Sequence, residues 1–295
     1  KNSNDDWNVA GHKDRIIIIG AAELELFANV FDGEGTPLEE AKLPSIHAKQ
    51  LIDVLTKISS HPERLKNYSS EFYSTVMFDE TYAQNDGTIR RDTQFPQSLD
   101  DLVLSGPHFF VGTPVYQTPK RVCETHKAYD NVDLSIISED YLPRSNYVPN
   151  CSRAEFNSRI PKVNWFNGEQ RKPVTEFYRL GVRKRLSQSG VRTIIPCIMP
   201  KQTSHILTVL GTAFKSEHLL ANAVASMSSI TFDFFIKSTG QADFTAGSMP
   251  LIPVIQEPYF SKILPRILGL NALTSHYSEL WSRLFTNRFN VEQWT

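Results

Sequence analysis

The sequence predicts a mixed α+β fold, with a smaller helix-containing segment at 1–100 and a larger domain of short strands and helices at 101–295. The 295 residues are 40% hydrophobic and 21% charged, which is a normal globular composition and enough chain for one large domain or two ordinary ones. Apolar residues recur at helical spacing in some segments and form β-branched runs in others. Prolines and aromatic residues interrupt 104–175, which favours loops and short strands there.

The first hundred residues predict a strand, two helices and an extended segment. A β-branched run at 15–20 predicts a buried strand. Residues 22–31 follow with apolar side chains at helical or mixed spacing. Apolar side chains at 43–61 recur close to every 3.6 residues, with Ser45 placed to cap the helix. Residues 69–81 predict an extended segment.

The region beyond residue 175 predicts more regular structure. Regular structure begins at 175–186, and 191–200 predicts a β-branched strand that ends at a proline. Residues 218–237 predict a helix that runs into a strand, and 250–285 predict short helical turns before a final helix. The segment 199–205 is then expected to be a loop between a strand and a helix.

Charged residues are unevenly distributed along the chain, although its net charge is only −1. Residues 1–100 carry a net charge of −7, whereas 112–205 carry +7. Within 153–192, ten basic residues face three acidic ones. Clustered Lys and Arg raise the local potential and release counterions from phosphates, so the basic block indicates a polyanion-binding surface. A solvated basic face without a partner is the alternative.

Several classes of site are not indicated. Cys123, Cys151 and Cys197 are too few and too scattered for a disulfide framework, and none forms a C-x-x-C zinc pair. The eight histidines show no metal-ligand spacing, so we expect no metal. No apolar run reaches the roughly 18 residues that span a bilayer. The start is polar and acidic rather than a signal peptide, so we expect a cytoplasmic chain cut from a longer one.

Catalytic motifs are also not found. Glycine-rich cofactor loops, the P-loop, H-E-x-x-H and G-x-S-x-G patterns are missing. Thr113-Pro114-Val115-Tyr116 is related to the Asn/Asp-Pro-Pro-Tyr/Phe motif that holds a flipped adenine, but Thr113 cannot offer the same acceptor oxygen. We therefore expect a chain that is non-catalytic by itself. The alternative is a complete enzyme with a site near His108, Thr113 and Tyr116.

Two stretches have a recognisable organisation. Residues 177–211 hold an arginine-containing strand followed by Arg-Thr-Ile-Ile-Pro at 192–196 and a leucine-rich segment. Residues 226–254 hold Ser-Ile-Thr-Phe-Asp-Phe at 229–234 and close on Pro-Leu-Ile-Pro at 250–253. This order resembles the target-recognition region of type IIG and Eco57I-like adenine-specific DNA methyltransferases of restriction–modification systems.

The resemblance covers about two-thirds of the chain, and it implies a division of labour. This chain would be the specificity part that recognises a sequence in double-stranded DNA. The catalytic methyltransferase domain of the same polypeptide would bind S-adenosylmethionine, and a nuclease domain accompanies it in type IIG enzymes. The family's catalytic motifs are not in this sequence, so no catalytic residues are carried over.

The candidate DNA contacts are long cations for phosphates and amides or hydroxyls for base edges and phosphates. The cations are Arg144, Arg153, Lys162, Arg171, Lys172, Arg183, Arg185, Lys201 and Lys237. The amides and hydroxyls are Asn146, Asn164, Gln202, Thr203 and Ser204, with Asn167 and Gln170 as further amides. Ser204 is expected near a helix N-terminus, where phosphate binding is favoured.

Some residues have a structural alternative. Asp233 lies in an aromatic run, so we expect it to be structural and paired with Arg179, Arg183 or Arg192. Trp165 suits core packing more than base stacking. A third hypothesis for function is a protein-interaction domain that uses the acidic residues 1–100.

Overall fold

The computed structural model describes residues 3–7, 11, 13–32, 35–46, 48–166, 168 and 170–292. The chain divides into two compact units. The first contains residues 1–62 and 234–240, and the second contains 63–233 and 241–295. This division differs from the expected boundary at residue 100 because residues 63–100 supply strands that pair within the second unit.

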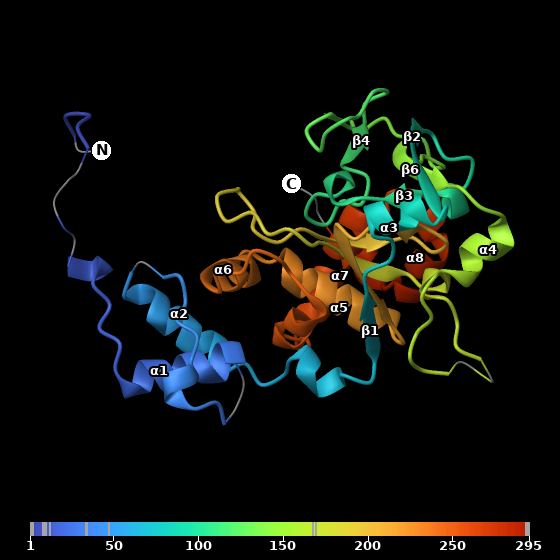
Figure 1. Cartoon of the computed structure of the whole chain (residues 1–295). Helices are drawn as coiled ribbons and strands as arrows, with labels where there is room; N and C mark the ends of the chain where they lie inside the picture. The colour runs from blue at the N-terminus through green and yellow to red at the C-terminus, as the bar shows by residue number, and fades with distance from the viewer. Residues whose placement is uncertain are drawn as a thin grey trace. The chain divides into compact units, whose positions relative to one another are not determined.

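The elements confirm a mixed α+β fold (Figure 1). The helices are α1 (Ala21–Phe27), α2 (Gln50–Ser59), α3 (Glu80–Asn85), α4 (Arg153–Ser158), α5 (Glu217–Ser228), α6 (Ile230–Ser238), α7 (Tyr259–Asn271) and α8 (Ser278–Leu284). The strands are β1 (Phe72–Thr75), β2 (Ile89–Gln94), β3 (Val103–Leu104), β4 (Gln117–Pro119), β5 (Tyr129–Asn131), β6 (Ser145–Pro149), β7 (Arg179–Arg183), β8 (Pro196–Met199), β9 (Ser204–His205) and β10 (Val209–Phe214).

The described part of the first unit is helical. Helix α1 continues into a π-helical turn at Ala28–Asp32, and α2 contacts both of these segments. Phe27 and Leu55 are fully buried, and the ring of Phe31 stacks on that of Phe235 with centroids 5.5 Å apart. Burial of large apolar side chains therefore holds these short helices together.

Two expectations for the first unit are wrong. Residues 15–20 do not form a buried strand, and Ile16 and Ile18 are 64% and 79% exposed. A strand needs a neighbouring strand to satisfy its backbone, and the described residues of this unit form no strand. Ser45 does not cap α2, because that helix begins at Gln50 with Lys49 in the capping position.

A four-stranded antiparallel sheet in the order β1–β10–β7–β8 lies in the second unit. Helix α5 contacts β7, β8 and β10. Gly181 and Gly211 are opposite each other on β7 and β10. A Cβ on Gly211 would lie 2.5 Å from His205 Nε2, and one on Gly181 would lie 2.8 Å from Met199 Cγ. The missing side chains therefore create the space that His205 and Met199 fill.

The segment after α5 is a second helix, α6, and not the predicted strand. Its aromatic and β-branched residues favour a strand, but Ser229 caps a new helix instead. The Ser229 hydroxyl accepts the N–H of Phe232 at 3.1 Å, and the Ser229 carbonyl accepts that of Asp233 at 3.1 Å. Among the described residues no single helix is long and apolar enough to cross a membrane, while α5 and α6 reach this only as a pair bent by 70°.

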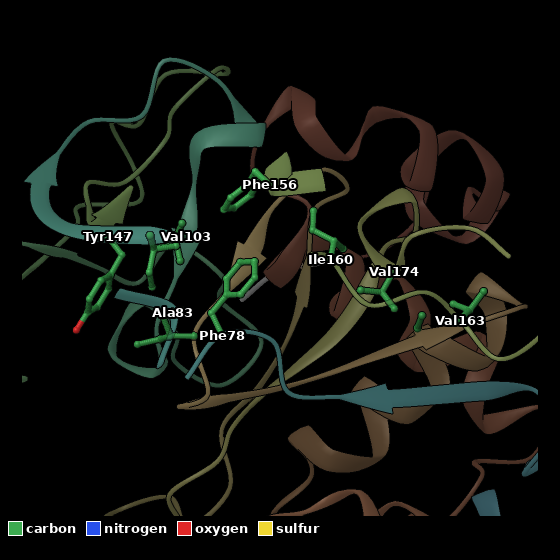
Figure 2. Packing of buried hydrophobic residues seen from close by; sticks show 11 residues of the cluster. Phe78, Ala83, Val103, Tyr147, Phe156, Ile160, Val163 and Val174 are labelled. Carbon is green, nitrogen blue, oxygen red and sulfur yellow. The ribbon is translucent and has the colours of Figure 1, made fainter. Parts of the chain in front are cut away.

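One core cluster lies where segments far apart in the sequence meet (Figure 2). The rings of Phe78 and Phe156 are 5.3 Å apart, and Ile160, Val163 and Val174 extend the cluster. Val163 and Val174 are almost completely buried. The core therefore fixes both ends of the chain segment between them.

Candidate nucleic-acid interface

Residues 161–174, called the 161–174 loop below, form an anchored projection. The Val163 N–H donates to the Lys172 carbonyl at 3.0 Å, and the Val174 N–H donates to the Pro161 carbonyl at 2.9 Å. Trp165 packs against the core cluster and meets Phe177 edge to face at 5.7 Å, so the core alternative for Trp165 is confirmed. The base of the loop is therefore ordered by packing and hydrogen bonds.

The loop carries three predicted DNA contacts. Lys162, Asn164 and Arg171 are all exposed, with Lys162 at the base of the loop, where it pairs with Pro173. The Arg171 guanidinium lies over the Phe166 ring, 5.1 Å from its centroid, and Phe166 is 65% exposed. Gln170 is also exposed, whereas Asn167 lies outside the described residues. The loop therefore offers cations, an amide and an aromatic face to solvent.

Three further candidates line a groove of about 720 Å³ next to this loop. They are Lys172, Lys201 and Gln202. Lys172 pairs with Glu176 at 3.1 Å, and Lys201 pairs with Glu279 at 2.5 Å. The hydrogen bond from Lys201 lowers the pKa of Glu279. Both lysines are therefore compensated, and only Gln202 is exposed there as predicted.

Thr203 and Ser204 are not presented to a ligand. Both are fully buried, and the segment leads into strand β9 rather than into a helix. The Ser204 N–H donates to the Leu102 carbonyl at 3.0 Å, in the parallel pair of β3 and β9. The Thr203 hydroxyl accepts from the buried Arg179 guanidinium at 3.0 Å. The expectation of a phosphate site at Ser204 is therefore wrong, because strand pairing uses these groups.

Two more candidate cations are held by acids. Arg153 pairs with Asp101 and donates to the Asp100 carbonyl at 2.7 Å. Arg185 pairs with Asp243 at 3.5 Å, with both side chains well exposed. Asp101 and Asp243 therefore reduce the charge of the basic block within the second unit.

Arg144, Asn146 and Arg183 gather near strands β4 and β5. Asn146 is only 8% exposed and donates to the Tyr129 hydroxyl at 2.9 Å, so it is not available to read a base. Arg144 donates to the Pro119 carbonyl at 3.2 Å. Burial lowers the pKa of the half-buried Arg183 and raises that of Tyr129 to about 12. These groups support the fold around a hairpin.

The last candidate, Lys237, belongs to the first unit, whereas the other candidates belong to the second. It is exposed on α6, in the part of that helix that belongs to the first unit. Its neighbour Ser238, expected in the same exposed loop, is buried and donates to the Phe235 carbonyl at 2.7 Å. The helix therefore presents a cation here rather than a polar loop.

The expected structural role of Asp233 is confirmed. Its Oδ1 accepts the N–H groups of Thr193 and Ile194 at 2.8 and 2.9 Å. Arg192 Nε lies 3.3 Å from the same oxygen, with both side chains mostly buried. Arg179 is also structural, since it is buried in β7 and burial lowers its pKa to about 9.

The alternative site near His108 has a buried imidazole that is already bonded. Nδ1 accepts the Ser105 N–H at 3.0 Å, which leaves the proton on Nε2 to donate to the Arg144 carbonyl at 2.8 Å. Thr113 is buried in a tight turn with Phe110, and the Tyr116 ring packs against Phe110 at 4.8 Å. Both ring nitrogens of His108 thus serve the backbone.

The cations between β4 and β5 are not among the DNA contacts predicted from the sequence. Lys120, Arg121 and Lys127 are exposed there, as is His126. Their signal is a short basic segment between two stretches that can pair as strands, but neither stretch shows a clear alternation of polar and apolar residues. The hairpin of β4 and β5 is identified only by the backbone pairing of the two strands.

Two further findings concern metal binding and similarity to known proteins. Within the described residues, no group of three or more His, Cys, Asp and Glu side chains is placed to hold a metal ion. The chain matches no model of a known protein family and no curated protein.

Proposed function

We propose that this chain is the specificity part of an adenine-N6 DNA methyltransferase of a restriction–modification system, and that it binds duplex DNA in a sequence-specific way. In this proposal the catalytic domain of the same polypeptide binds S-adenosylmethionine and transfers the methyl group. The observation that carries the proposal is the 161–174 loop, in which the buried Val163 and Val174 hold a segment that exposes Lys162, Asn164 and Arg171. Its location is proposed to be cytoplasmic.

The chemistry of the loop suits DNA. Lys162 and Arg171 form no ion pair within the described residues, so their charge is available for phosphates. An asparagine amide can pair with the edge of adenine, as Asn164 would do. Phe166 offers an exposed ring to a base or to the wall of a groove. A rigid base reduces the entropy lost when such a loop binds.

The order of elements also supports the proposal. The arginine-containing segment forms β7, and the Thr-Ile-Ile-Pro segment at 193–196 leads into β8. The leucine-rich end of 177–211 leads into strand β10 and not into a helix, and helix α5 follows it. The Phe-Asp-Phe segment at 232–234 lies on α6. The two strands β7 and β8 are thus the part of this succession that supports the proposal.

The test is binding of the whole chain to a pool of random-sequence duplexes of about 30 base pairs, measured by fluorescence anisotropy between about 50 and about 200 mM salt. We expect affinity to fall by at least about tenfold across this range, because each phosphate contact releases counterions. A change of less than about twofold would contradict duplex binding.

Two double variants locate the contact. K162A/R171A should bind the same duplexes roughly tenfold more weakly and with a salt slope reduced by about two. K66A/R288A is the matched control, because it removes the same charge from two exposed positions away from the loop. Equal affinities for the two variants would remove the loop from the proposal. Calorimetry with S-adenosylmethionine should show no binding, and measurable binding would favour the complete-enzyme hypothesis.

A further inference from the structure

Strand β4, labelled in Figure 1, pairs with β5 in a two-stranded antiparallel ribbon, and the end of this ribbon carries basic residues. Gln117 is opposite Asn131, and Pro119 is opposite Tyr129. The Lys120 N–H donates to the Ala128 carbonyl at 2.9 Å, which extends the pairing by one step beyond the strands. Residues 121–127 then close the end of the ribbon. We call residues 117–131 the basic ribbon.

The tip of the basic ribbon is cationic and largely uncompensated. Arg121 and Lys127 are exposed and form no ion pair within the part of the chain that the structure describes. Lys120 faces Asp130 at 3.6 Å, but both side chains are more than half exposed, so solvent and salt screen this pair. Glu124 is the acid within the tip itself.

The basic ribbon is held in place both at its strands and at its closing segment. At the closing segment Cys123 is buried, Arg91 donates to its carbonyl at 2.6 Å, and Asn146 donates to its Sγ at 3.2 Å. At the strands the Arg144 N–H donates to the Thr118 hydroxyl at 2.9 Å, and the Arg144 guanidinium donates to the Pro119 carbonyl at 3.2 Å. Both guanidinium groups therefore bond to carbonyl oxygens of the basic ribbon, add positive charge beside it and fix its direction.

A two-stranded ribbon is an element that can enter a nucleic-acid groove. The major groove of B-DNA is about 12 Å wide and admits a two-stranded β-ribbon. Lys120, Arg121 and Lys127 are long enough to contact the phosphates on either side of such a groove. Val122 is 71% exposed at the tip and offers an apolar side chain of the kind that contacts the thymine methyl group.

We propose that the basic ribbon is a second DNA-contacting element and that its tip enters the major groove. This inference rests on the proposed function, because it assumes that the chain binds duplex DNA. It adds the residues that the 161–174 loop does not contain: Arg121 and Lys127 contact phosphates, and Val122 contacts base edges. Asn146, Arg91 and Arg144 act as positioning residues that hold the basic ribbon.

The first test is the variant R121A/K127A, compared with K66A/R288A in the same anisotropy assay. The two substituted side chains make no hydrogen bond in the described structure, so the melting temperature should match that of the wild type. We expect a roughly tenfold loss of affinity and a salt slope lower by about two. If the wild type binds with strong salt dependence and R121A/K127A behaves like the control, the inference fails while the proposed function stands. A wild type without salt-dependent binding would overturn both.

The second test distinguishes groove entry from contact with phosphates alone. Duplexes in which every cytosine carries a glucosylated hydroxymethyl group have the same phosphates but a filled major groove. The wild type should bind them roughly tenfold more weakly than unmodified duplexes, and R121A/K127A should lose much less. Equal wild-type affinity for the two kinds of duplex would contradict entry into the major groove.

Discussion

At the scale of single residues, Asp233 joins two segments that are far apart in the sequence. Its carboxylate accepts two backbone N–H groups and faces Arg192, in a site that is mostly buried. A buried donor that loses its acceptor keeps its full desolvation cost, and a buried cation that loses its partner is costlier still. Asp233 therefore stabilises the turn before β8 more than a surface pair would.

Substitution at Asp233 should destabilise the protein in a graded way. We expect D233A to lower the free energy of unfolding by about 3 kcal/mol, because it leaves both N–H groups without an acceptor and removes the carboxylate beside Arg192. D233N should cost about 1–2 kcal/mol, since its amide oxygen still accepts. Urea unfolding measures both values. D243A removes the exposed partner of Arg185 and should cost less than about 1 kcal/mol, so equal losses in D233A and D243A would contradict this role.

The sequence predicted Asp233 correctly because a lone acid in an aromatic run needs a partner. It predicted the DNA contacts less well. Charge alone cannot distinguish the exposed Lys162 from Lys172, whose carboxylate partner lies one helical turn away at Glu176. Nor does composition reveal that Thr203 and Ser204 are buried, because that depends on the pairing of β9 with a strand about a hundred residues earlier.

At the scale of elements, the paired glycines on β7 and β10 set the spacing between the sheet and the side chains that cover it. The His205 imidazole occupies the place of a side chain at Gly211. Overpacking a filled core forces side chains out of their preferred rotamers and moves the backbone. A side chain added at Gly211 on β10 would therefore displace His205 on β9.

We expect G211A to lower the free energy of unfolding by about 2–3 kcal/mol, because the new methyl group would meet His205 Nε2. Thermal unfolding measures the loss. G247A is the control, since the nearest atom to its added methyl group lies at 3.6 Å and the residue is exposed. Removing the obstacle in G211A/H205A should reduce the penalty below that of the two single changes added together. Simple additivity would show that the contact is not its cause.

Element prediction succeeded where local sequence decides and failed where a partner decides. The helical spacing in 43–61 does identify α2, although the helix begins later than Ser45 suggests. The isoleucine run at 15–20 has strand propensity but no strand beside it among the described residues. The aromatic segment of α6 became a helix because Ser229 caps it, which overrides its strand propensity.

At the scale of the whole molecule, two buried histidines link folding to pH. Burial, together with the nearby charge of Arg179, lowers the pKa of His205 to about 3. Burial also lowers the pKa of His108. Both imidazoles stay neutral in the folded protein at pH values where the unfolded chain, with a pKa of about 6.5, takes up protons. Their contribution is fully present above about pH 6.5 and is lost as the pH falls.

The free energy of unfolding should therefore decrease between about pH 6.5 and about pH 5, by up to about 1.4 kcal/mol per pH unit for each buried histidine. Urea unfolding at several pH values measures this slope. H205N should lower the slope by about 1.4 kcal/mol per pH unit, because it removes one titrating imidazole. Its amide can still donate to the Ile206 carbonyl as Nδ1 does, so the hydrogen bond is kept. An identical slope in H205N and the wild type would contradict the assignment.

The burial of Val163 and Val174 has a consequence for the evolution of this protein. Together with Trp165, these two side chains pack the 161–174 loop onto the core, while Asn164, Phe166 and Arg171 are exposed to water. Substitutions at the three exposed positions leave the hydrophobic interior intact, so selection can act on them almost independently of thermal stability. The loop is thus a site where a new preference for a ligand can arise without a compensating change elsewhere in the chain.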